Sequence, residues 1–400
     1  MQLQEGDSLK FLDLFAGIGG FRLGMEAAGH ECVGYVEIDK FARKSYEAIH
    51  NTEGEWTAHD ITSVTDDAIR GIGSIDIICG GFPCQAFSVA GKRKGFNDTR
   101  GTLFFEIMRF ASILRPRYLF LENVTGLLNH EGGDTFETII RTLDEVGYDA
   151  EWDCINSKEY VPQNRERVFI IGHSRESSTR KVFPIGEASG TVDESRITTG
   201  TLTARYPESQ REGTYIETYG KAGAINLVGN INPFGNGMNE QVYSSEGLSP
   251  TLTTNKGEGP KIVQKPRGFN NGGLHYIAPT LTSNSYHENN LLKIKEATKQ
   301  GYDIAYPGDS INYSVPDSKT RRGRVGKGIA NTLDTGCQQG VLTEEYRIRK
   351  LTPRECWRLQ GFPDWAFDKA ATVNSDSQLY KQAGNSVTVN VIEAIAKELY

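Results

Sequence analysis

The first 185 residues alternate between short apolar runs and amphipathic stretches, and this alternation limits the possible folds more than any other feature of the chain. Five apolar runs occur, at residues 10–15, 32–36, 75–78, 118–121 and 168–171. Helical patterns separate several of them, as at 103–114 and 135–146. Such alternation predicts an α/β fold in which helices cover both faces of a parallel sheet.

From about residue 186 to 345 the alternation is lost and the chain is rich in Gly, Asn, Thr and Ser. A Thr-Leu motif recurs there, centred on Leu202, Leu252, Leu281 and Leu333 at steps of 50, 29 and 52 residues. These steps are too irregular for a solenoid of stacked repeats. We therefore predict a second, smaller domain that is rich in β-strands and loops.

Helical order returns near the C-terminus. Thr352, Pro353 and Glu355 have the spacing of a capping box with proline at the first helical position, which predicts a helix to about Gln360. A last helix is expected at 389–399. The predicted catalytic and cofactor-binding domain comprises residues 1–185 and 368–400, and the second domain, with its hinge, comprises 186–367.

Composition excludes several classes of protein. No run approaches 18 apolar residues, so no transmembrane helix is expected, and the N-terminus shows no secretory signal. The six cysteines form no C-x-x-C pair, so we expect reduced thiols, no metal site and a cytoplasmic location. The net charge of −7 argues against a nucleic-acid partner. Residues 319–358, however, contain ten Lys or Arg against four acidic residues, a local excess of +6 that suits phosphate.

A glycine-rich turn follows the first predicted strand. Gly17, Gly19 and Gly20 permit a tight turn and close approach of the backbone to a ligand, and a helix begins next. Glu37 ends the second strand and suits a ribose diol. Arg22 replaces the third glycine of a dinucleotide fingerprint, which favours an adenosine ligand without a pyrophosphate over a nicotinamide. A plain strand–turn–helix corner is the alternative.

Cys84 lies in a Gly/Pro loop that follows the strand at 75–78. Pro83 stiffens this loop, and Lys92, Arg93 and Lys94 follow closely. Nearby cations favour a thiolate and also suit phosphate. The residues alone leave a nucleophilic Cys84 and an inert buried thiol equally open.

Two further sites follow core strands. Glu122 ends the run at 118–121, where apolar neighbours would raise its pKa for general-acid work; a capping or surface glutamate is the alternative. Arg165 and Arg167, spaced by one residue, point the same way from an extended segment. They suit an anion or a base carbonyl, and a surface row of ion pairs is the alternative.

Taken in order, these motifs resemble those of the DNA (cytosine-5)-methyltransferases of bacteria and phages. The resemblance rests on 13–21 (DLFAGIGGF), 81–85 (GFPCQ), 122–124 (ENV), 163–167 (QNRER), 349–355 (RKLTPRE) and 382–387 (QAGNSV). It covers residues 10–172 and 346–390. It implies a Rossmann-like sheet that binds S-adenosylmethionine, with residues 186–345 as the target-recognition domain.

The resemblance also implies roles for single residues. Cys84 adds to C6 of cytosine, Glu122 donates at N3, Arg165 holds the base carbonyl, and Arg167 supports Arg165 or Glu122. The family's cofactor pocket matches a larger set here: Phe15, Gly17, Gly19, Gly20, Glu37, Asp60, Ile61, Pro83, Leu103 and Asn385. The base that removes the C5 proton is not identified.

The family acts on a cytosine flipped out of duplex DNA, so double-stranded DNA is the expected partner. The loop from Cys84 to Arg100 is expected to close over that base, with Ser88, Lys92, Arg93 and Arg100 near phosphates. Thr332 belongs to the Thr-Leu turn that anchors the recognition domain. We expect a monomer, and the sequence leaves open both the target sequence and a cognate restriction endonuclease.

Three other functions share parts of this sequence pattern. A transfer-RNA cytosine methylase shares the core motifs, but the long Gly/Thr-rich second region favours DNA. A catalytically inactive DNA-binding regulator is disfavoured by the intact Cys84, Glu122 and Arg165. A nicotinamide dehydrogenase is disfavoured by Arg22.

Overall fold

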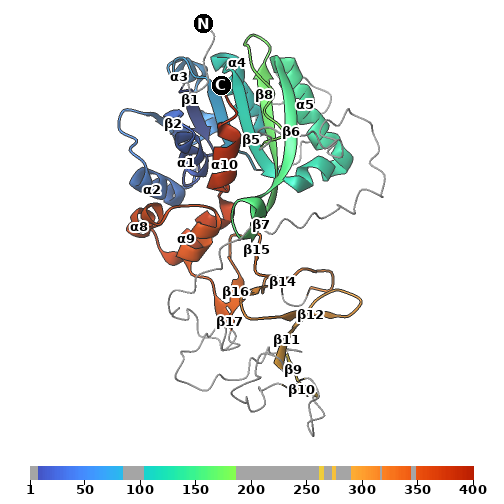
Figure 1. Cartoon of the computed structure of the whole chain (residues 1–400). Coiled ribbons are helices and arrows are strands. Elements are labelled where there is room, and N and C mark those ends of the chain that lie inside the picture. Colours follow the sequence, from blue (N-terminus) through green and yellow to red (C-terminus); the bar gives the residue numbers. More distant parts are fainter. Residues whose placement is uncertain are drawn as a thin grey trace, which may run out of the picture.

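A seven-stranded sheet forms the larger domain, as the computed structural model shows (Figure 1). The structure describes residues 8–83, 103–185, 261–264, 273–275, 290–315, 318–343 and 348–400. Strand order in the sheet is β3-β2-β1-β4-β5-β8-β6. The strands span β1 Lys10–Leu14, β2 Glu31–Val36, β3 Trp56–Ala58, β4 Ile77–Gly81, β5 Tyr118–Val124, β6 Tyr148–Asn156 and β8 Glu166–Ser174.

The first five strands are parallel to one another, which confirms the predicted α/β fold. Strands β6 and β8 differ, because β8 runs antiparallel to both β5 and β6. The physical reason is the connection between them. Residues 157–165 are too few for the helical crossover that a parallel pair requires, so the chain turns back on itself.

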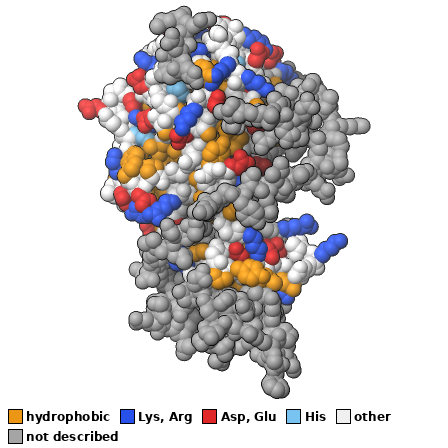
Figure 2. All heavy atoms as spheres, viewed as in Figure 1, with side chains coloured by type: hydrophobic (Ala, Val, Ile, Leu, Met, Phe, Trp, Pro, Cys, Tyr) orange, Lys and Arg blue, Asp and Glu red, His pale blue; other side chains and the backbone are white. Residues whose placement is uncertain are grey.

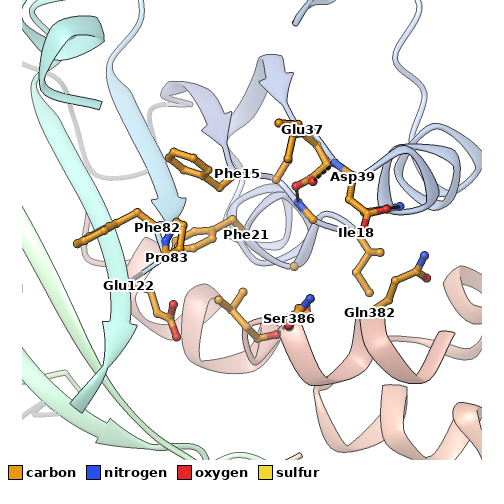
Figure 3. Close-up of a pocket in the computed structure, with 18 of the residues that line it drawn as sticks. Phe15, Ile18, Phe21, Glu37, Asp39, Phe82, Pro83, Glu122, Gln382 and Ser386 are labelled. Carbon is orange, nitrogen blue, oxygen red and sulfur yellow. Dashed lines mark hydrogen bonds between the residues drawn. The ribbon is translucent and has the colours of Figure 1, made fainter. Parts of the chain in front are cut away.

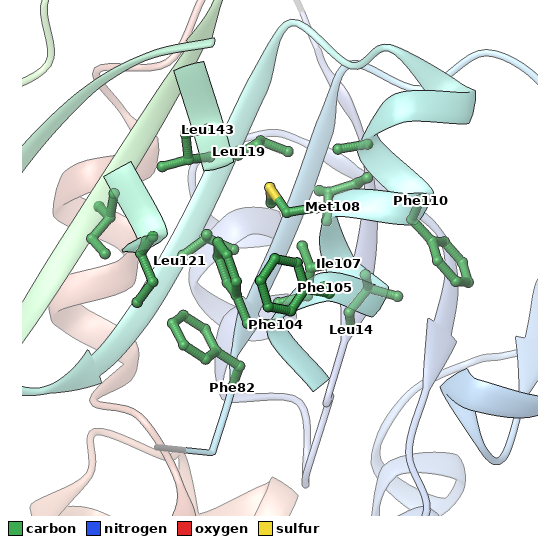
Figure 4. Packing of buried hydrophobic residues seen from close by; sticks show 14 of the residues in the cluster. Leu14, Phe82, Phe104, Phe105, Ile107, Met108, Phe110, Leu119, Leu121 and Leu143 are labelled. Atoms are coloured by element: carbon green, nitrogen blue, oxygen red, sulfur yellow. The ribbon is translucent and has the colours of Figure 1, made fainter. Parts of the chain in front are cut away.

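Helices cover both faces of this sheet. On one face α4 (Leu103–Leu114) and α5 (Asp134–Val146) pack against Leu12, Leu14 and Leu119, and Figure 4 shows this cluster around Met108. On the other face α1 (Gly20–Ala27) and α10 (Val389–Ala396) pack against Phe11 and Phe120. The C-terminal helix thus completes the core of the first domain. The other helices that the structure describes before residue 160 are α2 (Lys40–Ile49), α3 (Asp66–Arg70), and the short helices η1 (Ile61–Ser63), η4 (Thr125–Gly133) and η5 (Ser157–Glu159).

The C-terminal helices form a third packed group. They are α7 (Pro353–Leu359), α8 (Asp364–Ala371) and α9 (Asp376–Asn385). The predicted capping box at Thr352 and Glu355 is present, with both of its hydrogen bonds. Trp357 of α7 is fully buried and its indole N–H donates to the Leu379 carbonyl. The predicted domain limits at 185/186 and 367/368 stay a prediction.

The second domain consists of short strands (Figure 1). One four-stranded sheet has the order β10-β9-β11-β12 and the other β14-β13-β16-β17. Their limits are β9 Lys261–Gln264, β10 Gly273–His275, β11 Asn290–Lys295, β12 Tyr302–Ala305, β13 Ser310–Asn312, β14 Val325–Gly326, β16 Gln339–Leu342 and β17 Ile348–Lys350.

One strand pair joins the two domains. Strand β15 (Ala330–Asn331) of the second domain runs parallel to β7 (Gln163–Asn164) of the first. Within the described residues, no helix has the length and apolar character that crossing a bilayer requires. On the face shown in Figure 2, Lys and Arg side chains project from the second domain.

Candidate active site

A cavity of about 500 Å³ opens where the parallel strands β1, β2, β4 and β5 end. Ligands bind at this edge in open α/β sheets. Figure 3 shows Glu37 and Asp39 on one side of it and Phe82, Pro83 and Glu122 on the other. Of the predicted cofactor residues, those that line the cavity are Phe15, Gly17, Gly20, Glu37, Asp60, Ile61, Pro83, Leu103 and Asn385.

The glycines of the β1–α1 turn have different physical reasons for being glycine. Gly17 has φ +57°, a conformation that favours glycine, and a Cβ built there would meet no atom within 4 Å. Gly19 shares the left-handed conformation, with φ +84°, and a Cβ there would also overlap the His50 ring. At Gly20 a Cβ would lie 2.8 Å from Val387. Gly19, which is not among the lining residues, therefore serves the packing beneath the turn, whereas Gly17 is open towards the cavity.

Glu37 links the β1–α1 turn to the residues that follow β2, at the edge of the cavity. Its carboxylate accepts the Gly17 N–H at 2.7 Å and the Asp39 N–H at 2.7 Å. Burial raises the pKa of Glu37, and these two hydrogen bonds oppose that shift. A ribose bound here would share a carboxylate that already holds the glycine turn, so Glu37 has a structural task as well.

The neighbouring wall is formed by η1 and the start of α4. Asp60 caps η1 by accepting the Thr62 N–H at 2.9 Å, and hydrogen bonds from Thr62 lower the pKa of Asp60. Ile61 is buried beside it. Ile38, which the sequence analysis missed, is 68% exposed and also lines the cavity. Its position directly after Glu37 was the available signal.

Glu122 and Arg167 form the opposite wall. Arg167 Nε lies 3.0 Å from Glu122 Oε1, and a Cβ on Gly81 would lie 2.9 Å from Glu122 Oε2. Burial raises the pKa of Glu122, against the lowering effect of Arg167 and then Arg165. Asn123 donates to the Phe82 carbonyl at 2.9 Å and thereby fixes the chain just before Cys84.

Arg165 also lines the cavity, but its contacts differ from those of Arg167. Its Nη2 donates to the Ser386 carbonyl at 2.7 Å, and its Nη1 makes a longer contact of 3.4 Å to the Leu333 carbonyl. Its Nε is buried without a partner among the described residues. Burial, and then the charge of Arg167, lower the pKa of Arg165 to about 10, so the guanidinium remains charged at neutral pH.

Several predicted residues lie outside the described residues: Cys84, Ser88, Lys92, Arg93 and Arg100. Thr332 is described, and its hydroxyl donates to the Asn164 carbonyl at 2.7 Å across the two domains. The sequence analysis also missed a group from α9 on the cavity wall. Lys381 pairs with Asp39 at 2.7 Å, and Gln378 and Gln382 lie beside it. The signal was their closeness to the motif at 382–387.

Comparison with known proteins identifies the family. The model of the C-5 cytosine-specific DNA methylase family matches residues 9–400. The orphan methyltransferase M.SPRI of Bacillus phage SPR is 37% identical over 436 residues, which cover 98% of this chain and 97% of that protein. The type II methyltransferase M.HhaI of Haemophilus parahaemolyticus is 31% identical, with 97% and 93% covered.

A likeness in fold extends to solved structures. The S. pombe Dnmt2 methyltransferase superposes with a TM-score of 0.53 at 16% identity, over 97% of each chain. A family model that spans almost the whole sequence, a relative above one-third identity and a shared fold agree with one another. The chain therefore belongs to the C-5 cytosine-specific DNA methylase family and is a DNA cytosine-5 methyltransferase.

Proposed function

We propose that the chain transfers a methyl group from S-adenosylmethionine to C5 of a cytosine flipped out of double-stranded DNA, at a specific sequence. One observation carries the proposal. A single cavity has the glycine turn and Glu37 on one side, and Glu122, Arg167 and the residue before Cys84 on the other. A methyl donor and a base would thus meet in one space.

The cavity fits the proposed methyl donor. Gly17 is open to the cavity, Glu37 offers carboxylate oxygens to a ribose, and Ile38 and Ile61 offer apolar surface to an adenine ring. Asp60 and Asn385 add polar groups to the wall. S-adenosylmethionine supplies an electrophilic methyl group on a sulfonium. These residues bind and orient that group.

Cys84 and Glu122 act on the base. The Cys84 thiolate forms a bond to C6, and the electron pair of the C5–C6 double bond shifts towards C5 and the N3 side of the ring. Glu122, a carboxyl whose pKa is raised by burial, shares a proton with N3 and stabilises the charge that arrives there. C5 would then take the methyl group, as the methyl–sulfonium bond breaks and its electron pair stays on the neutral thioether. A base removes the C5 proton, and the bond from C6 to sulfur breaks as the ring double bond re-forms.

The two arginines orient these groups. Arg167 holds the Glu122 carboxyl at 3.0 Å. Arg165 retains its Nε–H, which has no partner among the described residues, as a donor for the cytosine carbonyl. Both charges also lower the pKa of Glu122 and so act against the effect of its burial.

We propose that the loop from Cys84 to Arg100 closes over the extruded base, with Ser88, Lys92, Arg93 and Arg100 near DNA phosphates. Flipping a base costs roughly a few kcal/mol, which such contacts would offset. The second domain, with Thr332 in its anchoring turn, would read the target sequence. We propose that the protein acts as a monomer in DNA modification, either alone, as the name of the phage relative suggests, or beside a restriction endonuclease.

The test is tritium transfer from labelled S-adenosylmethionine to unmethylated plasmid DNA and, in parallel, to transfer RNA. Bisulfite sequencing of the plasmid then locates the product. We expect label in DNA alone and a constant sequence around each 5-methylcytosine. Label in transfer RNA alone would show that RNA, and not DNA, is the substrate.

A matched pair of variants tests the mechanism. Cys84→Ala should abolish transfer while DNA binding persists, because the nucleophile is lost and the binding surface is kept. Cys154→Ala is the control, since Cys154 is an exposed free thiol far along the chain from the loop. Turnover in Cys84→Ala would exclude the covalent route.

A further inference from the structure

The extended segment at 163–167 divides its side chains between two tasks. Gln163, Arg165 and Arg167 are two residues apart, so they leave the same side of the strand. Arg167 reaches Glu122 in the cavity. Gln163 and Arg165 instead contact residues 331–337, which connect β15 to β16 and which we call the anchor turn.

The anchor turn is bound to the first domain by hydrogen bonds to its backbone and to Thr332. Gln163 Oε1 accepts the Leu333 N–H at 3.1 Å, and the Thr332 hydroxyl donates to the Asn164 carbonyl at 2.7 Å. Gln163 is fully buried, and its amide nitrogen donates to the Leu359 carbonyl at 2.8 Å. The anchor turn is therefore held by buried hydrogen bonds and does not lie on an open surface.

The same turn is also bound to the second domain. Gln339 of β16 accepts the Asn331 N–H at 3.0 Å and donates to the Asn331 and Thr332 carbonyls at 2.8 and 3.0 Å. Any displacement of β16 would thus move the anchor turn. The anchor turn is therefore hydrogen-bonded to both domains.

Arg165 adds the cavity wall to this connection. Its guanidinium meets the Leu333 carbonyl of the anchor turn at 3.4 Å, the Gly384 carbonyl at 3.5 Å and the Ser386 carbonyl at 2.7 Å. Gly384 and Ser386 both line the cavity. One buried cation therefore binds carbonyl oxygens of the recognition domain and of the cavity wall at once.

Gly384 shows how closely the two parts approach. A Cβ built on it would lie 2.3 Å from the Asp334 carbonyl oxygen and 2.7 Å from the Thr335 nitrogen. Both atoms belong to the backbone of the anchor turn, so a side chain could be accommodated only by moving the turn. The wall and the turn are in direct backbone contact.

We propose that Arg165, besides its proposed contact with the base, couples the second domain to the cofactor cavity through its Nη atoms, so that DNA bound by the second domain changes the affinity of the cavity for its cofactor. The inference rests on the proposed function. A change in the anchor turn removes a carbonyl dipole from a buried charge, which shifts the balance of the remaining bonds to Gly384 and Ser386. By linkage, the cofactor must change DNA affinity by the same factor.

The experiment measures that factor in both directions. S-adenosylhomocysteine binding is titrated calorimetrically with and without an unmethylated plasmid, and plasmid binding is measured with and without S-adenosylhomocysteine. For the wild-type chain we expect the two ratios to agree, at about fivefold or more, a usual size for such coupling. A wild-type ratio of one would overturn the proposal.

Two variants and a control complete the design. Arg165→Gln removes the guanidinium, and Gly384→Ala pushes the anchor turn away from the wall while Arg165 stays in place. Both should bring the ratio to about one. Arg175→Gln is the control, because Arg175 pairs with Asp144 and Asp149 on the exposed surface, and its ratio should equal that of the wild type.

The ratio separates coupling from mere loss of structure. A purely structural role would weaken both affinities and leave the ratio unchanged, and that result in the two variants would refute the proposal. Arg165→Lys retains the charge, and should give an intermediate ratio if Arg165→Gln fails to fold. Failure of the wild type to bind S-adenosylhomocysteine or DNA at all would instead count against the proposed function.

Discussion

Buried carboxylates behave differently in the two domains. In the second domain Glu296 accepts three backbone N–H groups, from Gly323, Arg324 and Val325, and Asp309 accepts those of Tyr306 and Gly328. In the first domain Asp13 is fully buried, yet its carboxyl has only long hydrogen-bond contacts among the described residues, to the Tyr46 hydroxyl at 3.5 Å and the Cys79 thiol at 4.0 Å.

The difference follows from what each domain must hold in place. Among the described residues, the second-domain cluster contains six buried hydrophobic side chains and the largest cluster of the first domain contains 24. The six are Leu292, Ile294, Ala305, Ile311, Val325 and Leu342. A small core leaves more of the backbone to be fixed by polar groups. Glu296 and Asp309 of the second domain therefore hold the chain. Three carboxyls of the first domain, Asp13, Glu37 and Glu122, instead have pKa values that burial raises.

The largest effect should come from Glu122, whose pKa is raised by burial and which we propose to act directly on the base. Glu122→Ala should lower kcat by about 10² to 10⁴, because a positioned proton donor contributes that much, while cofactor and DNA affinities persist. Single-turnover tritium transfer measures the loss. Glu145→Ala, on the exposed side of α5, is the control. An unchanged kcat in Glu122→Ala would mean that its burial serves structure alone.

Asp13 should make stability depend on pH. Burial raises its pKa to about 8, so the folded chain keeps a proton that the unfolded chain releases near pH 4. Stability is then greatest at low pH and falls as pH rises towards 8, by about 1.4 kcal/mol per pH unit from this group.

Urea unfolding of wild type and Asp13→Asn at pH 5 and pH 8 tests this expectation. The variant should lose less stability between the two pH values, by roughly 3 to 4 kcal/mol. If both proteins lose the same unfolding free energy between pH 5 and pH 8, Asp13 is not held neutral in the folded chain. The contrast between Asp13 and the second-domain carboxylates would then fail.

Glu296 tests the other side. Glu296→Ala leaves three backbone N–H groups without their acceptor, and should destabilise the second domain locally by about 3 kcal/mol. Hydrogen exchange at the amides of Gly323, Arg324 and Val325 measures this. S-adenosylhomocysteine binding in the first domain should not change. Lys299→Ala, at an exposed position of the same domain, is the control.

Glu37 combines both kinds of role and should give the smallest effect. Glu37→Ala should raise the KM for S-adenosylmethionine by about 10- to 100-fold, since a charged hydrogen-bond acceptor is lost from the Gly17 turn. Glu37→Gln should raise KM less, because its amide oxygen still accepts one N–H. DNA affinity measured by gel shift should stay near the wild-type value. Equal effects on KM and DNA affinity would argue against the ribose assignment.

The sequence could predict the elements around the site because their signals are local. Hydrophobic periodicity marked β1, α4 and α5, and the capping box marked α7, each within a window of a few residues. The resemblance to a known family supplied the larger set of predicted cofactor residues, nine of which line one cavity. The run at 168–171 was correctly predicted as a strand, now β8, but its antiparallel direction was not, because strand direction depends on the connection between strands. Strand β6 was not predicted.

What the sequence alone determined is the α/β plan and the set of chemical groups along it. Only the tertiary structure decided how those groups are shared. Arg165 and Arg167 are equivalent in spacing, yet one meets Ser386, 221 positions away, and the other meets Glu122. Gly384 is glycine because Asp334 lies against it, and a side chain on Gly19 would likewise meet His50. Such contacts depend on how distant segments pack, and no local pattern in the chain records that packing.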